Sequence, residues 1–334
     1  MNRILTFALL SILGVASPLR VNAQENDLPD RRNPQFSSER LQRPPEEGND
    51  AAEEPDFAFI AGGPYTQPKG SFQLIMAGQV GKRSVAQGAS TLKRSEYGTL
   101  LRNEWGLTDR WELDLVAPGS GERDAVRGIP PQSIFALSDS LIGIRYRLFK
   151  EGSFPLTLTM GPQLILPTGS VALGTSVGKA GYAWDLSTAK DWGGPVFIFS
   201  SFNYSFFPSV RSPVGISARR FNLYNYSFAS ALGYRALETG GGATPHHDVH
   251  GFVEFGLNRA ESFDGIGGKS AEVNLVVAPG IRYGLMTHYR NGVEEHLLEV
   301  GISFPFGLND RTPGRGVILQ VQFEHILNRW ATSE

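Results

Sequence analysis

Residues Leu156 to Leu166 read LTLTMGPQLIL, and this stretch decides the fold class. Leu158, Met160 and the alternate positions that follow are apolar, whereas Thr157, Thr159 and most of their successors are polar or small. A period of two residues is typical of a β-strand with one apolar and one mostly polar face. We therefore expect a strand here, with Leu158 on the apolar face and Thr159 facing water.

The same alternation recurs on both sides, in residues 142–148 and 182–187, and about twelve times between Gly70 and Phe323. The connections after odd-numbered strands are long and rich in Gly, Ser and charge. They are Lys82 to Arg94, Gly119 to Ala136, Gly169 to Lys179, Pro208 to Arg219, Arg259 to Gly268 and Phe306 to Arg315. The others are mostly short, with Glu238 to Asp248 as the exception. An even number of strands with alternating short and long connections is typical of bacterial outer-membrane barrels. The pattern predicts an all-β, antiparallel, up-and-down transmembrane barrel of about twelve strands.

The face opposite the apolar one carries many charged and amide side chains, which predicts a wet interior. These residues are Glu96, Arg102, Glu104, Glu112, Asp114, Asp139, Arg145, Arg147, Gln163, Asp185, Glu254, Glu272, Arg282, Glu299, Gln320, Gln322 and Glu324.

Six of these charges fall on three neighbouring strands near the short-turn end. They are Arg102, Glu104, Glu112, Asp114, Arg145 and Arg147, and we expect them to line the lumen together. One interpretation is a structural network, since cross-strand pairs of opposite charge stabilise a wall modestly. The alternative is a selectivity ring or a contact with a plug.

Composition and the first residues indicate an exported chain. The 334 residues are 41% hydrophobic, with no apolar run of 18 or more beyond the N-terminus, which argues against membrane helices. Arg3, the apolar run 4–15 and the small residues at 21–23 predict a signal peptide over residues 1–23. The sequence has no Cys, so disulfides do not stabilise it.

Residues 24–56 contain ten acidic residues and four arginines among Pro, Asn, Gln and Ser. A segment of this composition is expected to be disordered, as a spacer or as a docking arm. We assign residues 57–334 to the barrel domain. Basic and acidic residues are nearly balanced there, which gives no indication of nucleic-acid binding.

Neither a metal site nor a catalytic site is indicated. His246, His247, Asp248 and His250 follow a Gly-rich run, so we expect a solvated loop without preorganised ligands. No serine is patterned with a His and an orienting acid. We therefore predict no enzyme activity, no metal and no cofactor.

Three segments resemble the outer-membrane proteins grouped as the MetA-pathway of phenol degradation family. They are DSLIGIRYRL at 139–148, LILPTG at 164–169 and STAKD at 187–191, with Pro167, Thr168 and Gly169 as the sharpest part. The resemblance implies a barrel through which aromatic or other hydrophobic small molecules pass.

The expected protein is thus an outer-membrane channel for passive passage of small hydrophobic or aromatic solutes, with membrane lipid and the barrel insertion machinery as partners. The alternative is a structural or adhesive barrel with a closed lumen. One departure concerns insertion: such barrels usually end on an aromatic residue, whereas Phe323 and Trp330 here precede a short tail.

Overall fold

The computed structural model describes residues 59–87, 90–126, 131–192, 194–212, 220–241, 244–263, 268–287, 296–310 and 312–326. The expected signal peptide and acidic segment lie outside these residues. Every regular element in the described ranges is a strand, and no helix there is long and apolar enough to cross a membrane.

The strands run almost from one end of the described chain to the other. Their bounds are β1 Ser71–Gln87, β2 Ser90–Gly106, β3 Trp111–Val126, β4 Gln132–Leu137, β5 Ser140–Phe149, β6 Thr157–Leu166, β7 Gly181–Asp191, β8 Val196–Arg211, β9 Arg220–Gly241, β10 Thr244–Phe263, β11 Lys269–Thr287, β12 His296–Ser303, β13 Phe306–Gly307 and β14 Arg315–Ile326.

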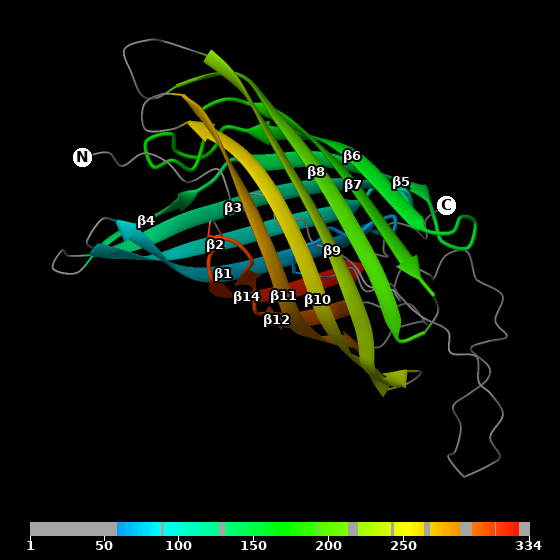
Figure 1. Cartoon of the computed structure of the whole chain (residues 1–334). Helices are drawn as coiled ribbons and strands as arrows, with labels where there is room; N and C mark the ends of the chain where they lie inside the picture. Colours follow the sequence, from blue (N-terminus) through cyan, green and yellow to red (C-terminus); the bar gives the residue numbers. More distant parts are fainter. Residues whose placement is uncertain are drawn as a thin grey trace.

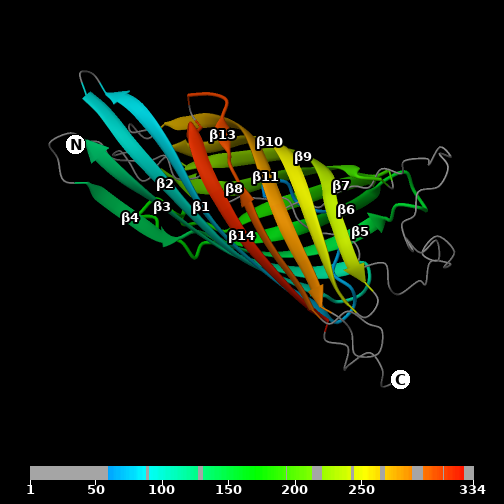
Figure 2. The ribbon, with the colours of Figure 1, turned by 90° about the horizontal axis from the view of Figure 1, so that it is seen from below.

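Antiparallel pairing closes these strands into a tilted barrel (Figures 1 and 2). Most strands pair with their neighbours in the chain, and β1 pairs with β14 to close the ring. The short β4 and β5 both pair with β3, so Ser138 and Asp139 interrupt one strand of the wall. Likewise β12 and β13 both pair with β11. The prediction of an up-and-down barrel of twelve strands is confirmed.

Side chains alternate between the two faces of the wall as the period of two predicts. Leu164, Trp184 and Leu186 are 39, 50 and 39% exposed, whereas Thr159 and Ser187 are fully buried. The exposed apolar residues form a belt around the barrel, with Trp105 and Trp111 at its short-turn edge. A continuous apolar belt of this extent suits the hydrocarbon of a bilayer and is rare on proteins in water.

Two predictions about the connections are wrong. Most residues of the first two stretches assigned to long loops, Lys82 to Arg94 and Gly119 to Ala136, belong to strands: β1 and β2 extend to Gln87 and Ser90, and β3 and β4 pair beyond the apolar belt. The connection Glu238 to Asp248, which was expected to be the long exception, is short, because β9 ends only at Gly241 and β10 already begins at Thr244. Cross-strand hydrogen bonds, despite register shifts between β9 and β10, outweigh the weak strand propensity of Gly in these segments.

Residues 59–68 lie inside the barrel rather than in its wall, and residues 69 and 70 are exposed before β1 begins. Phe59, Ala61 and Tyr65 are buried in an apolar cluster with side chains from β8 and β10. At Gly106 the backbone of this segment passes so close that a Cβ would lie 1.7 Å from the carbonyl oxygen of Pro68. Only glycine permits this approach. We call residues 59–67 the lumen segment.

Candidate functional site in the barrel lumen

Glu254 on β10 holds the first part of the lumen segment. Its carboxylate accepts hydrogen bonds from the backbone N–H groups of Phe59, Ile60 and Ala61, at 2.7, 2.6 and 3.2 Å. The next amide, of Gly62, donates to Ser201 Oγ on β8 at 2.8 Å. Glu254 is fully buried, so hydrogen bonds to a charged acceptor here are strong. The segment is therefore fixed to this wall through its backbone.

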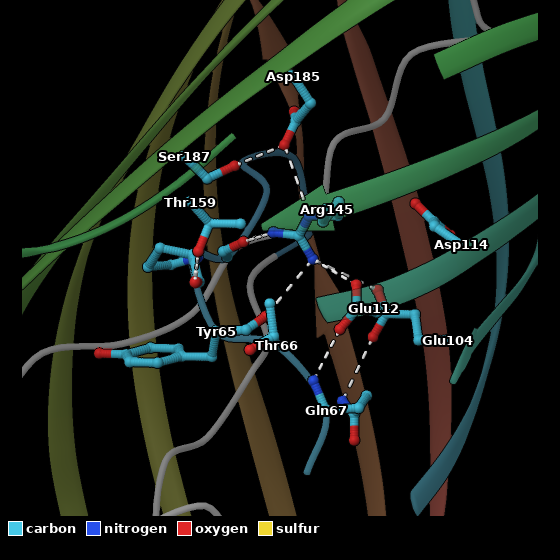
Figure 3. A network of polar contacts seen from close by, with 12 residues as sticks. Tyr65, Thr66, Gln67, Glu104, Glu112, Asp114, Arg145, Thr159, Asp185 and Ser187 are labelled. Carbon is cyan, nitrogen blue, oxygen red and sulfur yellow. Dashed lines mark hydrogen bonds and ion pairs between the residues drawn. The ribbon is translucent and has the colours of Figure 1, made fainter. Parts of the chain in front are cut away.

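Arg145 on β5 holds the middle of the segment (Figure 3). Its guanidinium donates to the carbonyl oxygens of Gly63 and Tyr65, and the hydroxyl of Thr159 donates to that of Pro64. Arg145 also pairs with Glu112 on β3, with 2.9 Å between Nη1 and Oε1. The lumen segment thus lies where water was expected beside Thr159, and that expectation is wrong.

The far end of the segment is held by acidic residues of β2 and β3. The backbone N–H of Gln67 donates to Glu112 Oε2 at 2.8 Å, and its side-chain amide lies 3.4 Å from Glu104 Oε2. Between Phe59 and Gln67 the segment therefore crosses the lumen from β10 to β3, directly before β1 begins at Ser71.

The buried charges around the segment form one network. Arg102 makes two hydrogen bonds to Asp114, at 2.8 and 2.9 Å, and an ion pair with Glu104 at 2.8 Å. Arg145 lies 3.6 Å from Asp185. Two guanidinium groups thus face four carboxylates, and Gln67 donates to two of these. Removing one guanidinium would leave buried carboxylates without a cation, which is strongly destabilising.

The six residues predicted as one cluster divide into two groups. Arg102, Glu104, Glu112, Asp114 and Arg145 are at most 9% exposed and belong to the network. Arg147 lies apart, at the β2–β3 turn, where its guanidinium donates to the carbonyl oxygen of Asp109. A shift in the β5–β6 register follows Arg147, which marks the end of regular pairing there.

Aromatic rings fill the space beside the network. Phe59 packs edge-on against Phe252, with 6.2 Å between ring centroids, and Tyr65 packs edge-on against Phe199 at 6.4 Å. The interior is therefore charged, as predicted, only on the side of the network, and an apolar core lies on the β8–β10 side of the lumen.

Above the lumen segment, towards the long-connection end, lies a cavity of about 220 Å³. Ile60 and Gly62 contribute to its floor together with Arg102, Asp114 and Arg145. Most of its exposed surface is apolar, from side chains such as Leu100, Val116, Leu141, Ala229, Val276 and Ile318, and polar side chains including Gln79, Gln163, Asn203, Asn258 and Asn274 also line it. Near its mouth Arg83 pairs with Glu96 at 3.0 Å. The lumen thus offers an apolar chamber closed below by the segment.

The histidine-containing stretch is not a loop, so that prediction is wrong. Asp248 and His250 lie in β10 and are 3 and 1% exposed. His250 Nδ1 contacts the Arg282 guanidinium at 2.5 Å, and Arg282 Nη1 lies 3.3 Å from Glu299. Within the described ranges no group of three or more His, Asp or Glu side chains is arranged to hold a metal.

Pro167, Thr168 and Gly169 follow β6 and fix the break between β4 and β5. Thr168 Oγ1 accepts from the backbone N–H of Ser140 at 2.9 Å, and the Gly169 amide donates to Asp139 Oδ1 at 3.1 Å. The motif thus has an evident structural role at the long-connection end of the barrel.

The residues that sequence reasoning missed are those of the lumen segment. The signal was present: FIAGGPYTQ, residues 59–67, is apolar and aromatic, follows a polar tail, and shows no alternation. Such a stretch can be buried without forming a strand.

Comparisons with known proteins give only distant likenesses. No protein-family model and no curated protein matches the chain. Among solved structures, the COG4313 outer membrane channel from Pseudomonas putida F1 is 14% identical, with 78% of this chain and 97% of that chain covered and a TM-score of 0.46. The β-domain of the Bordetella autotransporter Brka is 14% identical, with 76 and 98% covered and a TM-score of 0.42. The CymD monoaromatic hydrocarbon channel is 5% identical, with 78 and 89% covered and a TM-score of 0.33. All three TM-scores are below 0.5, so these likenesses assign neither a family nor a solute to the chain.

Proposed function

We propose that the chain is a bacterial outer-membrane barrel through which small hydrophobic or aromatic molecules pass without energy input. The observation that carries the proposal is the apolar chamber of about 220 Å³ inside a barrel with an apolar outer belt. An apolar cavity of about 150 Å³ in an engineered protein binds benzene, so a chamber of this size accommodates one aromatic ring. A signal peptide at residues 1–23 and the barrel insertion machinery would bring the chain to this membrane.

In this proposal the lumen segment is the gate. It closes the chamber on the short-turn side, and its hydrogen bonds to Glu254, Ser201 and Arg145 must break before a solute reaches the periplasm. Passage then follows the equilibrium between a bound and a released segment. In this proposal the network of Arg102, Glu112 and their neighbours binds the lumen segment in the closed state and does not form an open selectivity ring.

The second candidate is a structural or adhesive barrel that never opens. The depth of the segment favours it, since Phe59 and Ala61 are 1 and 0% exposed and the segment is bonded to several strands. The two candidates differ in whether the segment ever leaves its site.

Uptake of a labelled neutral monoaromatic into whole cells tests the proposal, because the lipopolysaccharide leaflet slows direct entry through lipid. Val116→Trp fills the chamber and should reduce uptake to the level of cells without the protein. Leu115→Trp, one residue earlier and on the outer face, is the matched control and should leave uptake unchanged. Equal uptake by the two variants contradicts passage through the chamber. No uptake by the unaltered protein, at normal amounts in the membrane, favours the closed barrel.

A further inference from the structure

Four cations cluster on the outer face of the wall, just above the apolar belt at the long-connection end. Arg315 on β14 lies opposite Lys82 on β1, Lys82 lies opposite Ser95 on β2, and Ser95 lies opposite Arg123 on β3. Lys93 lies two residues before Ser95 and on the same face of β2. Since neighbouring strands are about 4.8 Å apart, the row from Arg315 to Arg123 spans roughly 14 Å.

These cations lack counter-charges on their own face. The carboxylates of the same strands, Glu96, Glu122 and Asp124, sit at inward positions and pair with Arg83 and Arg94. None of the four outward cations makes an ion pair with a described residue, and all four are exposed. Two other cations of the wall, Arg259 and Lys269, do have a carboxylate partner, because both pair with Glu261, at 3.0 and 2.8 Å.

An apolar groove of about 520 Å³ lies on the same face directly beneath this row. Its lining includes Gly78, Val80, Tyr97, Thr99, Phe135 and Leu319, and the polar residues Gln79, Glu122 and Ser133 also border it. The next row down the wall joins Val317, Val80, Tyr97, Gly121 and Phe135, and the row after it places Gly78 between Leu319 and Thr99.

Glycine makes the groove possible. A Cβ at Gly78 would meet nothing within 4 Å, so the floor of the groove is open there. The ring of Phe135, 55% exposed, lies over Gly119 and Gly121 and forms one rim. The volume falls within the range of about 300–1,000 Å³ that is typical of ligand sites.

We propose that this surface binds a phosphorylated glycolipid of the outer leaflet, of the lipid A type. Its phosphates lie on the cation row, where guanidinium and ammonium groups form strong charge-assisted hydrogen bonds to phosphate oxygens. One of its acyl chains fills the groove below. The long-connection end faces the outside in barrels of this kind, which assigns the row to the outer leaflet. The inference uses the proposed outer-membrane placement but does not require that the lumen conducts.

The test is a binding measurement on the full refolded chain in zwitterionic detergent, with fluorescent diphosphoryl lipid A as the probe. Replacing Lys82, Lys93, Arg123 and Arg315 together by Gln should weaken binding at least tenfold. The matched control replaces Arg211 and Arg220 by Gln, because they are also exposed outward cations, directly opposite each other on β8 and β9. This control should bind like the unaltered protein.

Two further arms identify the ligand. Gly78→Leu keeps every charge but fills the groove, and it should weaken binding of the lipid several-fold. Dephosphorylated lipid A should bind at least tenfold more weakly than the diphosphoryl form, and millimolar inorganic phosphate should not displace the probe.

Several results would overturn the inference. These are equal binding by the four-cation variant and the Arg211/Arg220 control, equal binding of phosphorylated and dephosphorylated lipid, or full displacement of the probe by inorganic phosphate. Heat-modifiability on a gel verifies the folding of each variant. If the four-cation variant does not fold, the Gly78→Leu variant decides by itself: undiminished lipid binding by this variant overturns the inference. Because binding is measured in detergent, its loss leaves the proposed solute passage standing.

Discussion

Replacing Glu254 by Gln is the perturbation that most directly weakens the gate. The carboxylate accepts three backbone hydrogen bonds, one on Oε1 from Phe59 and two on Oε2 from Ile60 and Ala61. Gln keeps one acceptor oxygen and places an NH₂ group against the remaining donors. Leaving one or two buried N–H groups without an acceptor costs about 2 to 4 kcal/mol in total. At 1.36 kcal/mol per factor of ten, the released segment becomes roughly 30- to 900-fold more populated.

Thiol labelling measures this population, because the sequence has no Cys of its own. A cysteine at Ala61 is covered while the segment is bound, because Ala61 is fully buried and does not line the chamber, so its labelling rate follows the released fraction. The rate should rise by roughly the same factor in Glu254→Gln. Glu261→Gln is the control, since Glu261 also lies on β10 but bonds to Tyr224, Arg259 and Lys269 instead of the segment. An unchanged labelling rate in Glu254→Gln, with folding intact, would refute the role of this carboxylate.

Two other pairs of substitutions test the faces of the wall and the buried network. Leu158→Arg should destabilise the barrel by about 1 kcal/mol or less, because Leu158 lies at the short-turn edge of the belt: Met160, two residues along β6, pairs with Tyr146, which pairs with Trp111. Thr159→Arg should be at least as harmful, because the lumen segment occupies the space beside this position. If Thr159→Arg and the unaltered protein unfold at the same urea concentration, Thr159 faces water instead. Arg145→Gln leaves buried carboxylates without their cation and should cost about 3 to 5 kcal/mol. Arg147→Gln, at the turn outside the network, should cost about 1 kcal/mol or less by the same measurement, and equal losses would contradict the division between them.

The wall of the barrel could be predicted from sequence because its physical cause is local. Alternation at Leu158 and Thr159 follows from one face meeting lipid and the other the lumen, and pairing of neighbouring strands then fixes the order. Strand length was predicted less well. Gly-rich stretches such as the one before His250 suggested loops, yet cross-strand hydrogen bonds carry β9 and β10 through them.

The contents of the lumen could not be predicted in the same way. Phe59 and Glu254 are 195 residues apart, and their contact joins a backbone N–H, which every non-proline residue has, to a carboxylate. The local sequence pattern at neither position predicts such a hydrogen bond. The charge pattern did predict that Glu112 and Arg145 lie together near the short-turn end, but not that they hold a segment of the chain.

Planar-bilayer conductance of a reversibly locked barrel tests most directly whether solutes pass through the lumen by release of the segment. Gly62 N lies 2.8 Å from Ser201 Oγ, so cysteines at these two positions are close enough for a disulfide in a chain that has no other. The account predicts that the oxidised protein shows no openings and that dithiothreitol restores the openings of the unaltered barrel. Identical conductance before and after reduction, with the disulfide verified by mass spectrometry, would contradict it.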